Sequence, residues 1–557
     1  MQRQVGSVMG RIVPIVVLAA TWGVPLDGIA RAGPELARGP VPADAFVDDF
    51  DHDGYSDLVM GAPNENFNGR TDMGAVNVLH GASPGLTATG DQFFTQDSAN
   101  VDGGGEDGDR FGWAVATGNF NRDAYGDVAI GVPNEDVGSV DDAGGVNVIY
   151  GSASGLSATA TLPDQFWSQD SVDVQETAET GDLFGSALAA GDFNEDGYTD
   201  LAVGVPGEHI VSVAPPIGGV NVLYGSPTGL DASFVGDQFL RQGGAGVNDS
   251  PEPGDAFGYA LAAGDFNHDG VSHEDLAIGV PGEDVGDVDD AGAVNVVYGT
   301  DEGLSASGPP ADQFWTQDSP DVFGSSEESD QFGKALAAGD FGSNFMKDLA
   351  IGVPGEDLGT VSNAGGVNVL YGTSDFGLNT TQTLDQFWSQ DSANVEDSGE
   401  PDDHFGAALV AADFGGSGGR DDMVVGVPGE NVGSVLDAGA VAVIYSSTLG
   451  LRATTTPDQL WHQGVTDVYG STEKADALGS ALGAADFGAS SQADLAVGVP
   501  GESVGAVASA GGASVIYGSV GGLSATVTAD QFWSQDTAGV IDVCEASDRS
   551  GAALAPR

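Results

Sequence analysis

The stretch Asp192-Phe-Asn-Glu-Asp-Gly-Tyr-Thr-Asp200 decides the fold, because the rest of the chain repeats it. Oxygen-bearing side chains stand at its first, third, fifth and ninth positions: Asp192, Asn194, Asp196 and Asp200. The backbone carbonyl of Tyr198 can add an oxygen, and Gly197 permits a sharp turn around an ion. Since a hard cation such as Ca²⁺ takes about six to eight oxygen ligands, the stretch predicts a calcium-binding loop.

The flanks of this loop predict strands. Residues 184–191 precede it and residues 201–206 follow it, and both segments are short, apolar and interrupted by glycine. Such segments are typical of buried β-strands, and neither has the length or the 3.6-residue period of a helix. The predicted metal loop therefore joins two strands.

The loop recurs along the chain at a nearly constant spacing. Successive first positions are separated by 70, 73, 73, 75, 73 and 73 residues. These positions are Asp49, Asn119, Asp192, Asp265, Asp340, Asp413 and Asp486. Seven copies at so steady a period indicate a repeat architecture in which each unit packs on its neighbours.

Each repeat contains phrases that predict four short strands. A Phe-Gly pair followed by small residues, as at 184–191, predicts an inner strand crowded against its symmetry mates. After the metal loop an apolar strand ends in Gly-x-Pro, and after an acidic loop a third strand alternates, as at 219–225. The phrase Asp-Gln-Phe-Trp, as at 164–167, predicts an outer strand whose tryptophan packs between blades rather than binding a ligand. Four such strands repeated seven times predict an all-β fold, a seven-bladed β-propeller of four-stranded antiparallel blades.

The Phe-Gly pair, the Asp-x-Asx-x-Asp-Gly loop and the Gly-x-Pro strand together resemble the FG-GAP repeats of the integrin α-subunit head, over about residues 43–549. The resemblance implies Ca²⁺ in the loops between strands 1 and 2 of the blades. It also implies that the 2–3 and 4–1 loops gather on the opposite face, where integrins bind partners. Here those loops are acidic, as at Glu135, Asp136, Asp141 and Asp142. Because the leg domains and membrane helix of an integrin are missing, we expect a stand-alone, secreted, bacterial-type relative.

The ends of the chain differ from the repeats. Residues 1–32 predict a secretory signal, either cleaved or kept as an anchor, and residues 33–42 predict a linker. The propeller then covers 43–557, with repeats at 43–110, 111–183, 184–256, 257–331, 332–404, 405–477 and 478–549. Residues 41–47 make a poor inner strand without Phe-Gly, whereas the tail at 550–557 matches the start of an inner strand. The tail either completes the first blade, which would remove an open sheet edge, or is a remnant of a longer array.

The seven loops differ in their ligands. The first and third are complete, Ala124 replaces the glycine in the second, and the fourth has two extra residues, with Glu274 as an alternative closing ligand. The predicted metal ligands are Asp49, Asp51, Asp53, Tyr55, Asp57, Asn119, Asn121, Asp123, Tyr125, Asp127, Asp192, Asn194, Asp196, Tyr198, Asp200, Asp265, Asn267, Asp269 and Asp275. Loops five to seven lose their middle acids, so we expect two to four Ca²⁺ ions in all. The alternative is that the loops are polar turns whose aspartates cap backbone N–H groups.

Composition limits the class of partner. The chain has 557 residues, 84 of them acidic and 15 basic, with a formal net charge of -69. Nucleic acid and anionic membrane surfaces are excluded as natural partners, because both require Lys and Arg. The single cysteine, Cys544, excludes an internal disulfide. We therefore expect a soluble surface, part of whose acid serves divalent cations.

The sequence favours a binding function over catalysis. Residues 81–85 match Gly-x-Ser-x-Gly, but the same turn in other repeats varies at Ser83, so it does not mark a nucleophile. We expect no enzyme but a monomeric, secreted or cell-surface calcium-binding propeller that serves as an adhesion module for an extracellular protein or polysaccharide. An extracellular hydrolase or lyase with a site at the axis or on the loop face, and a purely structural envelope protein, are the alternatives.

Overall fold

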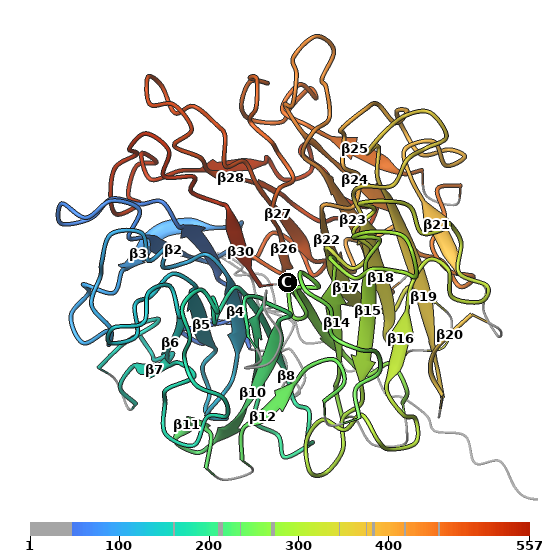
Figure 1. Ribbon diagram of the computed structural model, residues 1–557. Coiled ribbons are helices and arrows are strands. Elements are labelled where there is room, and N and C mark those ends of the chain that lie inside the picture. Colours follow the sequence, from blue (N-terminus) through green and yellow to red (C-terminus); the bar gives the residue numbers. More distant parts are fainter. Residues whose placement is uncertain are drawn as a thin grey trace, which may run out of the picture. The chain divides into compact units, whose positions relative to one another are not determined.

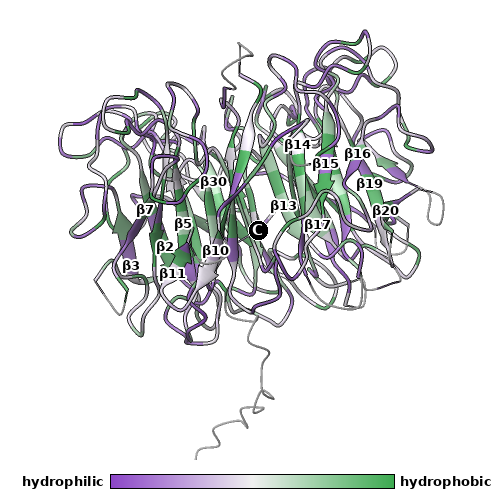
Figure 2. Ribbon diagram, turned by 60° about the horizontal axis from the view of Figure 1, so that its bottom comes forward, coloured by the Kyte–Doolittle hydropathy of each residue, from purple (hydrophilic) through white to green (hydrophobic). Residues whose placement is uncertain are grey.

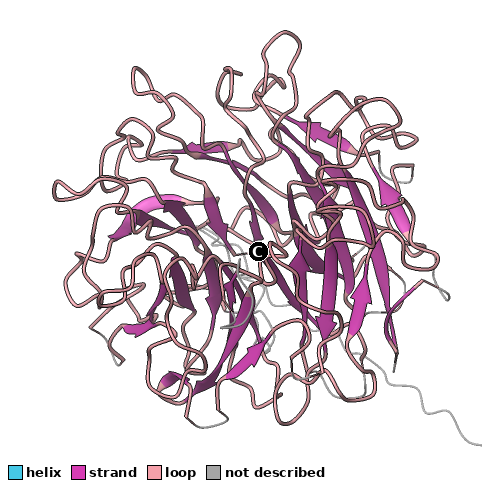
Figure 3. Cartoon of the chain, viewed as in Figure 1, coloured by secondary structure: helices cyan, strands magenta, loops and turns pink. Residues whose placement is uncertain are grey.

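The computed structural model describes residues 47–556, apart from 160–161, 210–215, 234–235, 245, 269–272, 343, 345, 375, 381–384, 417–418 and 455–456. The predicted signal at 1–32 and linker at 33–42 lie outside the described residues. Every described regular element is a β-strand (Figure 3). In this part of the chain no helix is long and apolar enough to cross a membrane.

The strands form seven antiparallel sheets around a central axis (Figure 1). From the axis outward, the first blade contains β30 (Ala553–Ala555), β1 (Leu58–Ala62), β2 (Ala75–His80) and β3 (Thr87–Phe94). The second contains β4 (Val115–Gly118), β5 (Asp127–Val132), β6 (Gly145–Ile149) and β7 (Gln165–Trp167). The third contains β8 (Ala187–Gly191), β9 (Asp200–Val205), β10 (Gly219–Ser226) and β12 (Gln238–Leu240), with β11 (Gly229–Asp231) added to β10.

The other four blades repeat this order. The fourth contains β13 (Ala260–Gly264), β14 (Asp275–Val280), β15 (Ala293–Val297) and β16 (Gln313–Trp315). The fifth contains β17 (Leu336–Gly339), β18 (Asp348–Val353), β19 (Gly366–Thr373) and β21 (Gln386–Trp388), with β20 (Gly377–Asn379) added to β19. The sixth contains β22 (Ala408–Ala412), β23 (Asp422–Val427), β24 (Ala440–Ile444) and β25 (Gln459–Trp461), and the seventh β26 (Leu482–Ala485), β27 (Asp494–Gly498), β28 (Ala513–Ile516) and β29 (Gln531–Trp533). The predicted seven-bladed, four-stranded architecture is confirmed.

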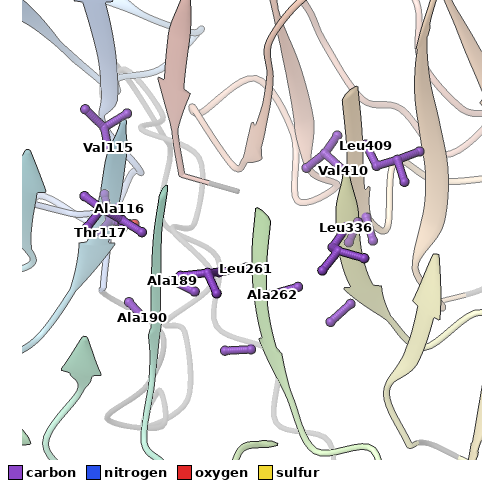
Figure 4. A pocket seen from close by; sticks show the side chains of 15 residues that line it. Val115, Ala116, Thr117, Ala189, Ala190, Leu261, Ala262, Leu336, Leu409 and Val410 are labelled. Carbon is purple, nitrogen blue, oxygen red and sulfur yellow. The ribbon is translucent and has the colours of Figure 1, made fainter. Parts of the chain in front are cut away.

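The inner strands line the axis. Strands β30, β4, β8, β13, β17, β22 and β26 contact one another in turn. Five of them surround an open cavity of about 140 Å³, whose 15 lining residues are Ala, Val and Leu apart from Thr117 (Figure 4). Since none of these described residues is titratable, the cavity gives no support to a catalytic site at the axis.

The two glycine phrases of the repeat meet across the blade interfaces. The Gly-x-Pro glycine of one blade lies against the carbonyl of the Phe-Gly glycine in the next. A Cβ atom at Gly131 would lie 2.1 Å from the Gly185 oxygen, and one at Gly204 would lie 2.2 Å from the Gly258 oxygen. Any side chain there would push neighbouring blades apart. Blade packing therefore explains why both glycines recur.

The C-terminal tail closes the ring. Strand β30 pairs antiparallel with β1 and aligns Ala553 with Gly61, Leu554 with Met60 and Ala555 with Val59. The first of the two closure hypotheses is therefore correct. The weak inner-strand candidate at 41–47 lies outside the described residues apart from Val47, and the inner position beside β1 is occupied by β30. Both sides of β1 are thereby paired, and the first blade has four strands like the others.

The hydrophobic core lies largely between adjacent blades. One cluster joins Phe50 and Val59 of the first blade to Val128 and Ile130 of the second. The outer-strand tryptophan Trp167 packs against an equivalent cluster, as predicted for the Asp-Gln-Phe-Trp phrase. Hydrophobic residues concentrate in the strands and hydrophilic ones in the loops at both ends of the blades (Figure 2). The strands thus form a rigid frame that presents two sets of polar loops.

Candidate metal loops

The loop at 192–200 connects β8 to β9 and folds around its own polar side chains. The two Asp192 carboxylate oxygens accept the N–H groups of Asp196, at 3.2 Å, and Gly197, at 2.9 Å. Asn194 Oδ1 accepts the Asp196 N–H at 3.0 Å, and Asp196 Oδ1 accepts the Tyr198 N–H at 3.0 Å. Gly197 has a φ of 83°, the left-handed turn that the sequence predicts. Three predicted ligands are therefore gathered on one turn.

The loop at 49–57, which leads into β1, has the same geometry. Asp49 accepts the N–H groups of Asp53 at 3.0 Å and Gly54 at 2.8 Å, and Asp53 accepts the Tyr55 N–H at 3.0 Å. Carboxylate oxygens of Asp49, Asp51 and Asp53 lie within 4.8 Å of one another. Because Ca²⁺–oxygen bonds measure about 2.3–2.6 Å, one cation can contact oxygens at that separation. The donor set, oxygen throughout, fits a hard divalent cation.

His80 is a residue of this region that the sequence analysis missed. It ends β2, is buried, and places its Nδ1 3.3 Å from Asp57 Oδ1 and 3.8 Å from Asp51 Oδ2. Contacts with these carboxylates raise the pKa of His80, against the opposing effect of burial. The other six repeats have tyrosine at this position, so a repeat-by-repeat comparison would have revealed the substitution.

The closing aspartate has a second, structural role in every loop. In the first loop, Asp57 Oδ2 accepts the Phe50 N–H and Asp57 Oδ1 accepts the Gly81 N–H, both at 2.9 Å. The same pair of bonds recurs at Asp127, Asp200, Asp275, Asp348, Asp422 and Asp494. The closing aspartate therefore links each loop to the third strand of its own blade. This structural role explains why the aspartate is present even in loops that lack middle acids.

The second loop keeps the turn but has a basic residue beside it. Asn119 Oδ1 accepts the Asp123 N–H at 3.0 Å, and Asp123 accepts the Tyr125 N–H at 2.8 Å. Asn121 also accepts the Asp123 N–H, at 2.9 Å. Arg122 reaches the carbonyl of Asp196 in the third loop at 3.0 Å. The second loop thus has fewer carboxylates than its neighbours.

The fourth loop departs most from the prediction. Asp269 lies outside the described residues. Asp265 accepts the His268 N–H at 2.6 Å, and its other oxygen lies 3.1 Å from His268 Nδ1. The Asn267 amide nitrogen is 3.4 Å from Asp275 Oδ1. Glu274 Oε2 accepts the Asp192 N–H of the third loop at 3.0 Å, so this carboxylate contacts the neighbouring loop.

In the fifth and sixth loops the protein supplies its own positive charge. Arg420 Nη1 lies 2.9 Å from both carboxylate oxygens of Asp340. Lys347 Nζ lies 2.9 Å from Asp421 Oδ2. These ion pairs stand where the loops have lost the middle acids.

Burial and mutual repulsion destabilise the ionised form of carboxylates in the first and third loops. Burial is the largest cause raising the pKa of Asp49, and the charges of Asp57 and Asp51 raise it further. Burial likewise raises the pKa of Asp192, and Asp196 adds to the shift. A bound divalent cation would relieve both effects, since an opposite charge favours the ionised carboxylate.

The opposite face carries a second acidic feature, which the sequence analysis did not foresee. Each blade has a Glu in its 2–3 loop and an Asp two residues before its Phe-Gly position. We call these pairs the junction carboxyls: Glu65 and Asp548, Glu135 and Asp109, Glu208 and Asp182, Glu283 and Asp255, Glu356 and Asp330, Glu430 and Asp403, Glu502 and Asp476. All are buried except the half-buried Glu356. Glu135, predicted on the partner-binding face, is thus buried, whereas Asp136, Asp141 and Asp142 are exposed.

The fold and the loops define the class of protein: a seven-bladed β-propeller whose first-to-second-strand turns carry acidic, metal-loop-like sequences. A model of the FG-GAP repeat matches residues 42–79, 111–149, 184–219 and 257–297. The chain therefore contains FG-GAP repeats in these four stretches and resembles integrin α subunits, as the sequence predicts.

Curated relatives match over parts of this propeller. Phosphatidylinositol-glycan-specific phospholipase D of Rattus norvegicus is 32% identical over 189 residues, which cover 34% of this chain and 20% of that protein. Integrin alpha-V of Gallus gallus is 31% identical over 252 residues, covering 43% of this chain and 20% of that protein. Integrin alpha-PS2 of Drosophila melanogaster is 33% identical over 181 residues, covering 31% and 12%. The chain thus spans about a fifth or less of the length of these relatives.

A solved structure also resembles the chain, at a low level. Rhamnogalacturonan lyase PL11 of Bacillus licheniformis matches 82% of this chain and 84% of that chain, with a TM-score of 0.32 and 10% sequence identity. Similarity of that degree adds nothing to the functional argument.

Proposed function

We propose that the protein is a secreted, calcium-binding propeller that serves as an extracellular binding or adhesion module. One observation carries the calcium part of the proposal. The first and third loops gather three oxygen-bearing side chains on one turn, whereas the fifth loop, which has lost its middle acids, is neutralised by Arg420. A divalent cation in the complete loops would take the electrostatic place that the guanidinium takes in the degenerate one.

The residues that would hold the ion are those of the complete loops. Asp49, Asp51 and Asp53 would provide carboxylates in the first loop, and Asp192, Asn194 and Asp196 would provide oxygens in the third. The backbone carbonyls of Tyr55 and Tyr198 and the closing aspartates would complete each set. The second loop is a weaker candidate because two of its ligands are asparagines.

The calcium proposal is tested by removing charge without removing the hydrogen bonds to the backbone. Asp53→Asn and Asp196→Asn keep the Oδ1 acceptors for the Tyr55 and Tyr198 N–H groups. We expect the double variant to fold normally and to lose the two tightest Ca²⁺ sites in calorimetric titration. Unchanged binding in the double variant would refute the assignment of these loops.

The partner would meet the exposed acids of the 2–3 loops, such as Asp136, Asp141 and Asp142. These residues lie on the face opposite to the metal loops, and their charge favours a cationic protein surface or a polysaccharide held through a bridging divalent ion. The test is an array of extracellular-matrix proteins and polysaccharides, probed in Ca²⁺ and again in EDTA. Saturable binding that D136N/D141N/D142N abolishes would support an adhesion module. Binding to none of the probes would favour the structural envelope alternative.

A further inference from the structure

The junction carboxyls form one cluster at every blade boundary, and each cluster is built in the same way. A Gln two residues after the outer strand of the preceding blade donates to the junction Glu, as Gln535 does to Glu65 Oε2 at 2.6 Å. The junction Asp accepts a backbone N–H three residues before it, as Asp548 does from Glu545. The seven clusters therefore share these hydrogen bonds and differ in their other residues.

The cluster between the seventh and first blades belongs to the more acidic of two kinds of junction. Oxygens of Glu65, Glu545 and Asp548 lie within 4.8 Å of one another. Asp542 joins them, because its side chain is within hydrogen-bonding reach of Glu65. The groups that face Glu65 are Asp548, Asp542 and Glu545, and their charges together with burial raise the pKa of Glu65 to about 9. Four carboxyl groups thus share one small space.

Two oxygens of this cluster have no hydrogen-bond partner within the described chain. Asp548 is fully buried, and its Oδ1 accepts no hydrogen bond. Asp542 Oδ2 is likewise a buried atom that accepts no N–H, and the group within its hydrogen-bonding reach is another carboxyl, that of Glu65. Buried polar atoms are normally satisfied, so unpaired oxygens beside other carboxylates point to a missing electropositive ligand.

The position of Asp542 separates the clusters into two kinds. It is also an acid in three other junctions, Glu176 between the second and third blades, Asp249 between the third and fourth and Asp397 between the fifth and sixth, but it is glycine at Gly103, Gly324 and Gly470. Between the third and fourth blades an open pocket of about 400 Å³ is lined by Asp249, Glu252 and Glu283, and Glu252 Oε2 and Asp255 Oδ1 there are also unpaired. An unpaired junction-Asp oxygen occurs in both kinds, since Asp476 Oδ1 at a glycine junction is also unpaired. What distinguishes the acidic kind is therefore the extra carboxylate.

We propose that the junction between the seventh and first blades binds a divalent cation of the calcium type through Glu65, Asp542, Glu545 and Asp548. The junctions at Glu283 and Glu430 offer equivalent sites. All donors are carboxylate oxygens, which suits Ca²⁺ better than a transition metal. Glu65 follows β1, whereas Asp542, Glu545 and Asp548 precede β30. The ion would therefore bridge the N-terminal and C-terminal parts of the propeller at the boundary that β30 closes. This site is separate from the metal loops, which lie at the other end of the blades.

The test is Asp542→Gly in the full chain. Glycine is what three other junctions have here, and the φ of 94° at Asp542 favours it, so the variant keeps the fold. Asp321→Gly is the matched control, because Asp321 is exposed, has a φ of 63° and lies outside the acidic junctions. In calorimetric titration with CaCl₂, Asp542→Gly should lose one site that the wild type and Asp321→Gly retain.

A second measurement locates the lost site. Hydrogen exchange in the wild type should slow in β1 and in residues 542–555 when Ca²⁺ is added, and Asp542→Gly should abolish that protection. The double variant in the metal loops should keep it, which distinguishes this site from the loop sites. If Asp542→Gly binds Ca²⁺ with wild-type stoichiometry and shows wild-type protection from hydrogen exchange, the carboxyl groups of the cluster share protons instead of binding a cation, and the proposal is wrong.

Discussion

The closing strand allows a quantitative prediction. Removing residues 550–557 deletes β30 and leaves β1 as an open edge. The lost interactions include the three aligned pairs with β1 and the bonds from the Gly551 N–H to Gly61 and from the Ala484 N–H to Pro556. The fully buried Leu554 side chain is also lost.

The magnitude follows from these contacts. Backbone hydrogen bonds contribute about 1 kcal/mol each net, and burying a leucine side chain contributes about 2–3 kcal/mol. The deletion should therefore cost at least about 5 kcal/mol, which equals the lower end of the total stability of folded domains. Leu554→Ala alone should cost about 2–5 kcal/mol. Because a unit of this size shifts its melting temperature by only about 1 °C per kcal/mol, melting is a poor readout.

The assay is therefore urea denaturation combined with hydrogen exchange. Leu188→Ala is the matched control, since Leu188 in β8 aligns with Val203 as Leu554 in β30 aligns with Met60, but in an unbroken part of the chain. Leu554→Ala should lower the urea midpoint and speed exchange selectively in β1. Leu188→Ala should lower the midpoint without exposing β1. If the deletion leaves both the midpoint and β1 protection unchanged, β30 does not close the ring.

Three further predictions follow from the polar contacts. In EDTA, the free energy of unfolding should fall as the pH rises from about 4.5 towards 8, because burial raises the pKa of Glu135 and Glu208 to about 8 and their deprotonation opposes the folded state. Urea midpoints at pH 5 and pH 8 measure this fall, and Glu135→Gln should make it smaller. Arg420→Gln should cost about 1–3 kcal/mol in urea, because it leaves Asp340 poorly paired; no loss would show that the ion pair is dispensable. Asp494→Asn should cost a similar amount although the seventh loop lacks middle acids, because Asp494 accepts the Phe487 and Gly518 N–H groups. A neutral effect would refute the structural role of the closing aspartate.

Much of the fold is predictable because each blade contains the local sequence signals for its own strands. The Phe-Gly, loop and Gly-x-Pro phrases define successive strands, and their seven-fold recurrence determines the architecture. The closure was left open because β30 is three residues long and its partner β1 lies near the other end of the chain. A short apolar segment of that length carries no periodic signal of its own.

The two polar faces differ in how far the sequence reveals them. The metal loops are visible because their ligands lie within nine residues, as in Asp192 to Asp200. The junction carboxyls are not, because Glu65, Gln535 and Asp548 come from three phrases that only inter-blade packing brings together. His80 was overlooked for a different reason: its contact with Asp57 lies within one blade, but it joins the third phrase of the repeat to the loop.

The most direct test of the calcium-binding account is a calorimetric Ca²⁺ titration of the wild type beside the Asp53→Asn, Asp196→Asn double variant, with urea curves in Ca²⁺ and in EDTA. The account predicts that the wild type binds Ca²⁺ at the first and third loops, that chelation lowers its urea midpoint, and that the double variant has fewer sites and a smaller response to EDTA. Identical titrations and EDTA-insensitive curves for both proteins would mean that the loops are polar turns and that the calcium assignment is wrong.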